Sequence, residues 1–191
     1  MSVKLLDCTL RDGGFINDWE FGHNQIINIF ERSVAANIDI VEVGFIDERR
    51  EFDRNRTIMP DGKAVNEIFN GLSTGESMIV GMIDYGTCSE NLIPDCADSF
   101  LDGIRVIFKK KNWVEALEYC KKLQDKGYKM FIQPVSITGY SDEEMLSLIQ
   151  AVNEMKPYAM SIVDTYGLLN LGNLLHYFEL IDSNLDSEIS M

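Results

Sequence analysis

Two hydrophobic periods alternate along this 191-residue chain, and no other feature constrains its fold as strongly. Apolar runs rich in β-branched residues predict strands at 3–6, 38–45, 77–83, 103–108, 128–135 and 158–164. Amphipathic segments between them predict helices at 24–37, 61–72, 113–127, 142–155 and 170–182. Successive strands joined by helical crossovers run parallel, because parallel neighbours cannot be linked by a tight turn. The pattern therefore predicts an α/β protein with one parallel sheet.

Helix-capping signals agree with this division of the chain. Ser141 precedes three acidic residues, a pattern typical of a helix N-terminus. Gly127 lies where the preceding helix should end. The segment 84–102 is less regular and predicts at most a short helix. No linker or low-complexity stretch divides the sequence, so we expect residues 1–191 to form a single domain.

Two architectures fit such a chain, a (β/α)₈ TIM barrel and an open doubly wound sheet. The sequence contains neither the GxGxxG motif of dinucleotide-binding sheets nor the GxxxxGK[ST] motif of P-loop sheets. Polar residues instead gather just after successive predicted strands: Arg11, Asp12, Glu42, Gln133, Ser136, Asp164 and Thr165. Polar side chains at the C-terminal ends of many strands are typical of a TIM barrel, which is the fold we predict.

Three of these strand ends carry familiar motifs. "LLDCTLRDGG" follows the first strand, "IDIVEVGF" forms the second, and "SIVDTYGLL" ends the sixth. Together and in this order they resemble the DRE-TIM metallolyases. That family includes 4-hydroxy-2-oxovalerate aldolase, 3-hydroxy-3-methylglutaryl-CoA lyase, and the isopropylmalate and citramalate synthases. The resemblance implies an enzyme that makes or cleaves a carbon–carbon bond beside the carbonyl of a small 2-oxo acid, through a metal-stabilised enolate.

The resemblance also implies roles for three residues. Asp12 takes the place of the family's ligand to Mg²⁺ or Mn²⁺, and Arg11 the place of the arginine beside the keto or enolate oxygen. Glu42 is implied to orient Arg11 or a metal-bound water. This chemistry is physically reasonable, because a hard dication polarises a carbonyl and a guanidinium stabilises an oxyanion. The alternatives are an ion pair at a strand end for Arg11 and Asp12, and a structural buried pair for Glu42. We expect the two glycines of "RDGG" to let the backbone turn beneath the substrate.

Other candidate residues keep two interpretations. Gln133 and Ser136 contact a substrate carboxylate or pack structurally. Asp164 and Thr165 bind substrate or the metal shell, or form an Asx turn. The charged loop 47–56, "DERREFDRNR", binds an anionic substrate tail or is simply solvated.

The sequence departs from the family in two places. Phe15 stands where the aldolase branch usually has a histidine base. His23 could replace that base, although a solvent-facing position at the start of a helix explains this residue as well. His176 is expected on the surface. The family's His-x-His metal ligands, at the end of the seventh strand, have no counterpart. A full barrel has about 250 residues, so we expect only the first six βα units and an incomplete domain. Its open sheet edges predict a homo-oligomer or aggregation.

Charge and cysteine usage limit the remaining possibilities. The net charge of −14 disfavours nucleic-acid binding, and no apolar run is long enough to span a membrane. The N-terminus lacks the features of a signal peptide. Four cysteines without CxxC spacing (Cys8, Cys88, Cys96 and Cys120) are typical of reduced thiols, so we expect a cytoplasmic protein.

The leading hypothesis is therefore a metal-dependent aldolase or lyase. One alternative is an acetyl-CoA-dependent Claisen-type acyltransferase. The other is a catalytically silent barrel that serves as a binding or assembly subunit, which the Phe15 substitution and the missing His-x-His pair favour. Neither the substrate nor the choice between Mg²⁺ and Mn²⁺ follows from the sequence, because both ions accept oxygen ligands in octahedral geometry.

Overall fold

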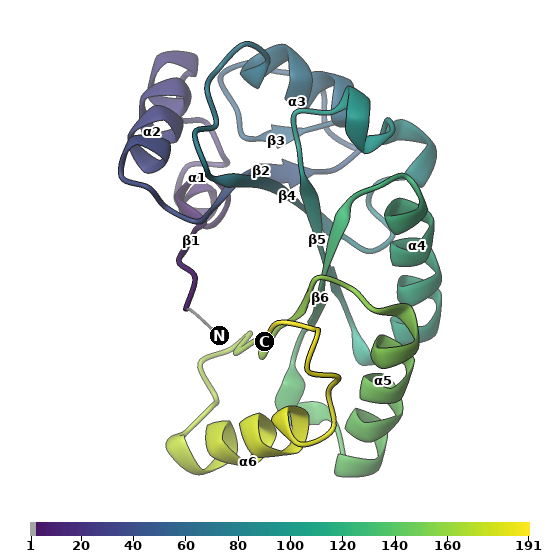
Figure 1. The fold of residues 1–191 in the computed structure, drawn as a ribbon. Helices are drawn as coiled ribbons and strands as arrows, with labels where there is room; N and C mark the ends of the chain where they lie inside the picture. The colour runs from purple at the N-terminus through teal and green to yellow at the C-terminus, as the bar shows by residue number, and fades with distance from the viewer. Residues whose placement is uncertain (1–2) are drawn as a thin grey trace.

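The fold is a curved, open parallel sheet with helices along its outer side (Figure 1). The structure is a computed structural model, which describes residues 3–191. All neighbouring strands pair in parallel, in the order β1-β2-β4-β5-β6-β7. The strands are β1 (Leu6–Asp7), β2 (Ile40–Ile46), β3 (Ile58–Met59), β4 (Met78–Asp84), β5 (Gly103–Phe108), β6 (Lys129–Pro134) and β7 (Ala159–Met160). The structure thus confirms a partial TIM barrel with parallel strands and alternating helices.

Five of the six helices lie close to the ranges predicted from the sequence; the short helix α1 was not predicted. The helices are α1 (Thr9–Asp12), α2 (His23–Ala35), α3 (Gly62–Phe69), α4 (Trp113–Asp125), α5 (Asp142–Met155) and α6 (Leu171–Asp182). Short 3₁₀ turns complete the chain: η1 (Gly13–Ile16), η2 (Glu90–Leu92), η3 (Cys96–Asp98), η4 (Lys110–Asn112) and η5 (Ile137–Gly139). The irregular segment 84–102 contains only η2 and η3, as expected. Ser141 caps α5 in a capping box with Glu144, which also confirms the sequence signal.

Three strand predictions need correction. The first strand covers only Leu6–Asp7 instead of 3–6, and the sixth predicted strand, 158–164, is regular only at Ala159–Met160. Both lie at the edges of the sheet, where one side of the strand has no full-length neighbour to fix its backbone. The strand β3 was not predicted, because a strand of two residues is too short to show a hydrophobic periodicity. It pairs with the end of β2, where Phe45 N donates to Thr57 O at 2.9 Å.

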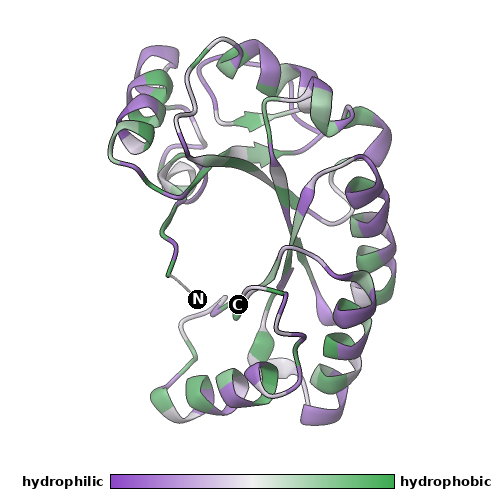
Figure 2. Cartoon of the chain, in the orientation of Figure 1, coloured by the Kyte–Doolittle hydropathy of each residue, from purple (hydrophilic) through white to green (hydrophobic). Residues whose placement is uncertain are grey.

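Two apolar layers lie on the two faces of the sheet. The larger core fills the space between the sheet and the outer helices, and it includes Phe30, Phe69, Ile104 and Leu148. The smaller cluster lies on the concave face and consists of Ile40, Val80, Phe131 and Ala159, with Leu6, Met78 and Tyr158 against it. Apolar residues accordingly concentrate on the strands (Figure 2), whereas α6 also carries exposed apolar residues. Strands buried on both faces explain the near-continuous apolar runs in the sequence.

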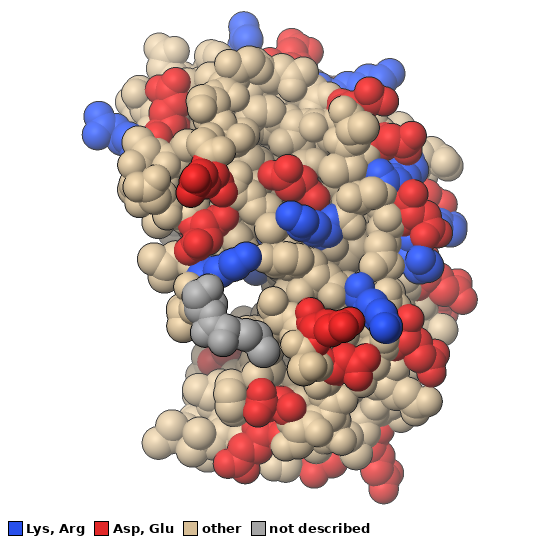
Figure 3. All heavy atoms as spheres, in the orientation of Figure 1, with Lys and Arg blue, Asp and Glu red and all other residues tan. Residues whose placement is uncertain are grey.

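The concave side of the sheet is open. In Figure 1, β1 and the C-terminal end of the chain lie on opposite sides of a gap. A cavity of about 700 Å³ lies on this side, lined by both edges of the sheet and by Arg105. Ser190 forms a parallel bridge with Ala159, so the chain begins to pair with the outer edge of β7. Acidic side chains outnumber basic ones on the face drawn in Figure 3, in keeping with the net charge of −14. Among residues 3–191, no helix combines the length and apolarity needed to cross a membrane.

Candidate functional site

The Arg11–Asp12 pair lies on a single helical turn that follows β1 directly. The backbone amides of Arg11 and Asp12 both donate to Cys8 O, at 3.0 and 2.7 Å. The Asp7 carboxylate accepts from Thr9 N at 3.0 Å and so satisfies a free amide at the start of this turn. Leu10 points into the core and is 1% exposed. The pair is therefore held at the C-terminal end of the first strand, the position at which TIM barrels place their chemistry.

The glycines after this pair have a different role from the one predicted. Gly13 has an ordinary helical backbone (φ −61°), and Gly14 has no positive φ either, so neither supplies an unusual turn. A Cβ on Gly14 would instead lie 1.9 Å from Cδ1 of Trp19. Close packing of the Trp19 indole therefore requires a glycine at position 14. The indole in turn donates from Nε1 to Arg11 O at 2.7 Å.

Arg11 is fixed by two carboxylates. Its Nε donates to Glu42 Oε2 at 2.7 Å, and its Nη1 donates to Asp12 Oδ1 at 2.6 Å. Burial opposes the charged form of Arg11, but the neighbouring Glu42 carboxylate outweighs it and raises the pKa of Arg11. Among the described residues, its Nη2 has no hydrogen-bond partner, while 15% of the side chain remains exposed. This nitrogen is available to an anionic ligand.

Glu42 lies in the middle of β2 and is completely buried. The prediction that it comes just after a strand was wrong: parallel pairing with β4 continues past it to Phe45, after a shift in register. Its Oε1 accepts from Arg105 Nη1 at 2.6 Å, while its Oε2 binds Arg11. Arg105 Nη2 also donates to Gln133 Oε1 at 3.1 Å. We call these four residues, Arg11, Glu42, Arg105 and Gln133, the buried polar row.

Arg105 was not among the predicted site residues. Its position in the middle of the apolar strand "GIRVIF" could have indicated it. A cation inside a buried strand needs a counterion, just as the carboxylate in "DIVEVGF" does. The parallel register of β2, β4, β5 and β6 brings these two charges together across the sheet.

A second set of contacts supports the backbone around Arg11. Thr57 is completely buried, and its Oγ1 donates to Leu10 O at 2.5 Å. Its amide donates to Trp19 O at 3.1 Å. Gly44 has φ +145°, and a Cβ there would lie 1.9 Å from Thr57 O, so only glycine lets β2 and this segment approach so closely. Sequence reasoning missed Thr57 and Trp19, which contribute through contacts distant in the sequence.

The other predicted binding residues divide into two groups. Gln133 is 3% exposed, belongs to the buried polar row, and its Nε2 has no partner within residues 3–191. Thr165 Oγ1 accepts from Ser136 N at 2.7 Å. Asp164 accepts from the amides of Leu168 and Leu169, at 2.8 and 3.3 Å; these amides lie four and five residues on, so the contact holds the following loop and is not the i+2 bond of an Asx turn. In the described part of the chain, no hydrogen bond joins Ser136, Asp164 or Thr165 to Arg11 or Asp12.

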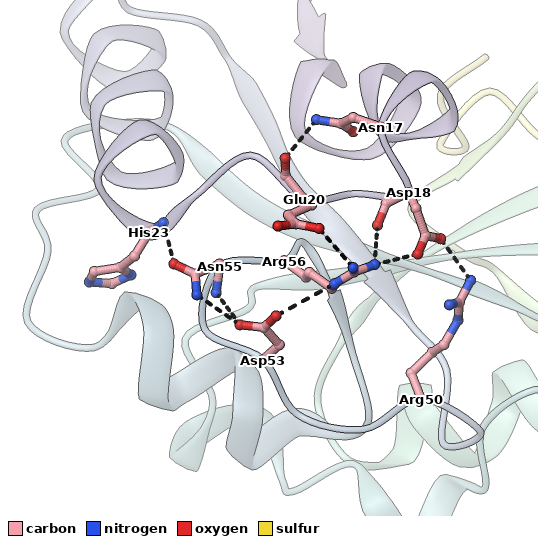
Figure 4. Close-up of polar contacts among 8 residues, drawn as sticks. All are labelled: Asn17, Asp18, Glu20, His23, Arg50, Asp53, Asn55 and Arg56. Carbon is pink, nitrogen blue, oxygen red and sulfur yellow. Dashed lines mark hydrogen bonds and ion pairs between the residues drawn. The ribbon is translucent and has the colours of Figure 1, made fainter.

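The arginines of the loop 47–56 mostly pair with nearby carboxylates (Figure 4). Arg56 binds the Asp18 carboxylate and donates to Asp18 O at 2.8 Å and to Glu20 Oε2 at 2.9 Å. Arg50 binds Asp18 as well, at 3.3 Å, and Arg49 binds Asp47. The hydrogen bond from Arg56 lowers the pKa of Asp18. The loop therefore anchors the 17–20 segment, which carries Trp19.

Neither histidine lies in the Arg11–Asp12 contacts. His23 begins α2, its amide donates to Asn55 Oδ1 at 3.1 Å, and it is half-buried rather than fully solvent-facing (Figure 4). His176 is on the surface, as predicted, with Nε2 2.8 Å from Asp142 Oδ1. Phe15 is 64% exposed beside Trp19 and supplies no base.

The described residues do not form a complete metal site. The Asp12 side chain is 62% exposed, so a cation can reach its carboxylate. No group of three His, Cys, Asp or Glu side chains within residues 3–191 is arranged to hold a metal ion. Mg²⁺ and Mn²⁺ prefer six oxygen ligands, to which this chain offers one candidate carboxylate.

Comparison with known structures agrees with this fold. The chain is similar to the N-terminal domain of a putative aldolase from Bacteroides vulgatus, with a TM-score of 0.72 and 20% identity over 96% of this chain and 62% of that one. It is also similar to the carboxyl transferase domain of Rhizobium etli pyruvate carboxylase solved with pyruvate, with a TM-score of 0.69 and 15% identity over 95% of this chain and 34% of that one. The chain thus spans less than two thirds of either structure.

These likenesses confirm the partial TIM barrel that the resemblance to DRE-TIM metallolyases implied. The two neighbours are an aldolase-like domain and a pyruvate-binding carboxyl transferase domain. No family model and no curated protein matches the sequence.

Proposed function

We propose that this chain carries the 2-oxo acid site of a carbon–carbon lyase of the aldolase type. The observation that carries the proposal is the fixed Arg11 guanidinium, held by buried Glu42 at the end of the first barrel strand. The pyruvate, 3-bromopyruvate and 3-hydroxypyruvate complexes of the carboxyl transferase neighbour support a 2-oxo acid as the ligand class.

Arg11 is suited to stabilise an enolate. In aldol cleavage of a 4-hydroxy-2-oxo acid, the bond between C3 and C4 breaks and its electron pair forms the C2–C3 double bond. The keto oxygen becomes the enolate oxygen, and the C4 hydroxyl gives its proton to a base. A guanidinium already in position stabilises the new charge without reorganisation. Arg11 meets this condition, because Glu42 and Asp12 hold its Nε and Nη1 and leave Nη2 for the ligand.

Asp12 is our candidate ligand for Mg²⁺ or Mn²⁺. Its exposed carboxylate fits a hard cation, yet it is a single ligand among the described residues, so we derive no catalytic step through a metal. The remaining substrate-binding candidates are Gln133, Ser136 and Thr165. Asp164 is a weaker candidate, because both of its carboxylate oxygens accept backbone hydrogen bonds.

A catalytically silent barrel is the second candidate function. Two observations favour it: Phe15 stands where a base is expected, and no group of three metal-binding side chains is present in residues 3–191. A silent barrel that serves in assembly requires no ligand at Arg11, so the absence of 2-oxo acid binding would favour it over the lyase.

The deciding experiment is isothermal titration of pyruvate into the protein, with and without Mn²⁺. We expect binding that weakens at least tenfold in Arg11→Ala, since that change removes the anion-binding group. Arg32→Ala, at an exposed arginine of α2, is the matched control and should bind pyruvate normally. Absence of pyruvate binding by the wild type under both conditions would favour the silent barrel. Affinity unchanged in Arg11→Ala would place the ligand elsewhere.

We further propose that the protein is a homo-oligomer in a reducing compartment such as the cytoplasm. The edges at β1 and β7 are not closed against each other, and α6 exposes an apolar stripe of Leu171, Leu174, Leu175 and Phe178 at helical spacing. All four cysteines are free thiols. Light scattering tests the oligomer, for which a single monomeric species is the contrary result.

A further inference from the structure

Three aromatic side chains form a continuous surface beside Arg11. Phe15 and Trp19 lie 5.0 Å apart between ring centroids, Trp19 and Phe45 5.6 Å, and Phe15 and Phe45 6.2 Å. All three pairs meet edge to face, a geometry that stabilises aromatic clusters. We call these three residues the aromatic wall.

The segment that follows Arg11 contributes Phe15 and Trp19 to the wall and also positions Arg11. The Trp19 indole donates to Arg11 O and fills the space left by the missing side chain of Gly14. The Arg11 guanidinium carbon lies 5.9 Å from the centroid of the Phe45 ring. A ligand whose anionic head binds Arg11 therefore has an aromatic surface next to it.

Phe15 is the accessible part of this wall. Its side chain is 64% exposed, whereas Trp19 is 9% exposed and Phe45 is half-buried. The next residue, Ile16, is 92% exposed, so two large apolar side chains reach solvent four and five residues after Arg11. Exposed apolar surface beside a fixed charge is typical of a site that binds a ligand with a charged group and an apolar group.

We propose that the substrate is a 2-oxo acid with a branched-alkyl or aryl group on C3, and that Phe15 determines this specificity. The proposal rests on the proposed function, because it places the oxo acid head at Arg11. The apolar group then covers the Phe15 ring and removes both surfaces from water. A histidine at position 15 would offer a polar edge there; phenylalanine favours an apolar substituent.

The test compares two ligands that differ only in this substituent, pyruvate and 4-methyl-2-oxopentanoate. Each is titrated calorimetrically into the wild type, Phe15→Ala and Leu146→Ala, in buffer containing Mg²⁺. Leu146 is the control, since it is an exposed apolar residue on α5, away from both the aromatic wall and the apolar stripe of α6. Circular dichroism confirms that each variant is folded, which the exposure of both side chains favours.

We expect the wild type to bind the branched acid about tenfold more tightly than pyruvate, the order of gain from removing a few methylene groups from water. Phe15→Ala should reduce this preference to about twofold or less, with pyruvate affinity unchanged, and Leu146→Ala should keep it. Equal binding of the two acids by the wild type, or an unchanged preference in Phe15→Ala, would overturn the proposal and leave the proposed function standing. Failure of both acids to bind would overturn the proposed function, and this specificity with it.

Discussion

Arg105 Nη1 lies 2.6 Å from Glu42 Oε1, although the two residues are separated by a strand in the sheet and by 63 positions in the sequence. Glu42 has no exposed surface, and only 11% of the Arg105 side chain is exposed. The other oxygen of the same carboxylate binds Arg11. One buried anion therefore holds two cations, of which only Arg11 is our candidate ligand-binding residue. Arg105 serves to position the carboxylate.

Removal of the shared carboxylate should be costly. We expect Glu42→Leu to lower the free energy of unfolding by about 3–5 kcal/mol, because it leaves the mostly buried Arg105 guanidinium without a counterion and Arg11 with only the exposed Asp12 carboxylate. Urea unfolding followed by circular dichroism measures the change. The same variant should lose pyruvate binding, since Nε of Arg11 is no longer held.

The pair Glu42–Arg105 can be tested separately with a double-mutant cycle. Arg105→Met leaves Glu42 paired only with Arg11. In the double variant Glu42→Leu/Arg105→Met, the carboxylate and the Arg105 guanidinium are both removed, so Arg105 is no longer a buried cation without its partner. We expect the double variant to be more stable than the sum of the single effects predicts, by about 1–3 kcal/mol. Strict additivity would show that the two side chains do not interact in solution.

Gly14 offers a test of the close packing behind Arg11. In Gly14→Ala the new Cβ must displace the Trp19 ring, so we expect a loss of about 2–3 kcal/mol in the free energy of unfolding, similar to other overpacked sites. Trp19 fluorescence should change at the same time. Gly139→Ala is the matched control, because a Cβ there meets no atom within 4 Å. If both variants were equally stable, the indole would not be packed as described.

These contacts show which parts of the molecule follow from the sequence. The order of the strands, the outer helices and the Ser141 cap follow from periods and local signals, because each depends on neighbours within one turn or one strand. The burial of Glu42 also follows, since a carboxylate inside an apolar strand has nowhere else to point. The partner Arg105 was not predicted. It contacts Glu42 only because the register of the sheet places the two residues close together.

The same reason explains the misread glycines. A "DGG" sequence resembles a flexible turn, yet Gly14 is required by a side chain five positions away in the sequence, and Gly44 by the backbone of Thr57. The two-residue strand β3 is formed by pairing with β2 and has no period of its own. Local sequence patterns indicate the secondary structure that a segment favours. These features depend instead on contacts with a segment distant in the sequence.

The loop 47–56 should stabilise the segment that carries Trp19. Arg56 joins the two, with bonds to Asp18 and Glu20, and 26% of its side chain is exposed. We expect Arg56→Met to cost about 1 kcal/mol or less in global stability, because partly exposed ion pairs contribute little. Amide hydrogen exchange in residues 17–20 should accelerate much more than in α5. Arg54→Met, at an exposed arginine without an ion pair in the described chain, should leave both unchanged.

Buried thiols should make the fold sensitive to alkali. Burial raises the pKa of Cys88 and Cys120 to about 12. A group whose pKa is higher in the folded state contributes stability that is complete below its unfolded pKa, about 8.5 for cysteine, and is lost as the pH rises through the folded pKa. We therefore expect the urea midpoint to be constant near pH 7–8 and to fall progressively between pH 9 and 12. Cys120→Ala should reduce the slope, because the alanine cannot ionise, while the Cys96→Ala control, at a half-buried thiol, should change it less. A slope identical in wild type and Cys120→Ala would mean that the thiol at position 120 is not buried in solution.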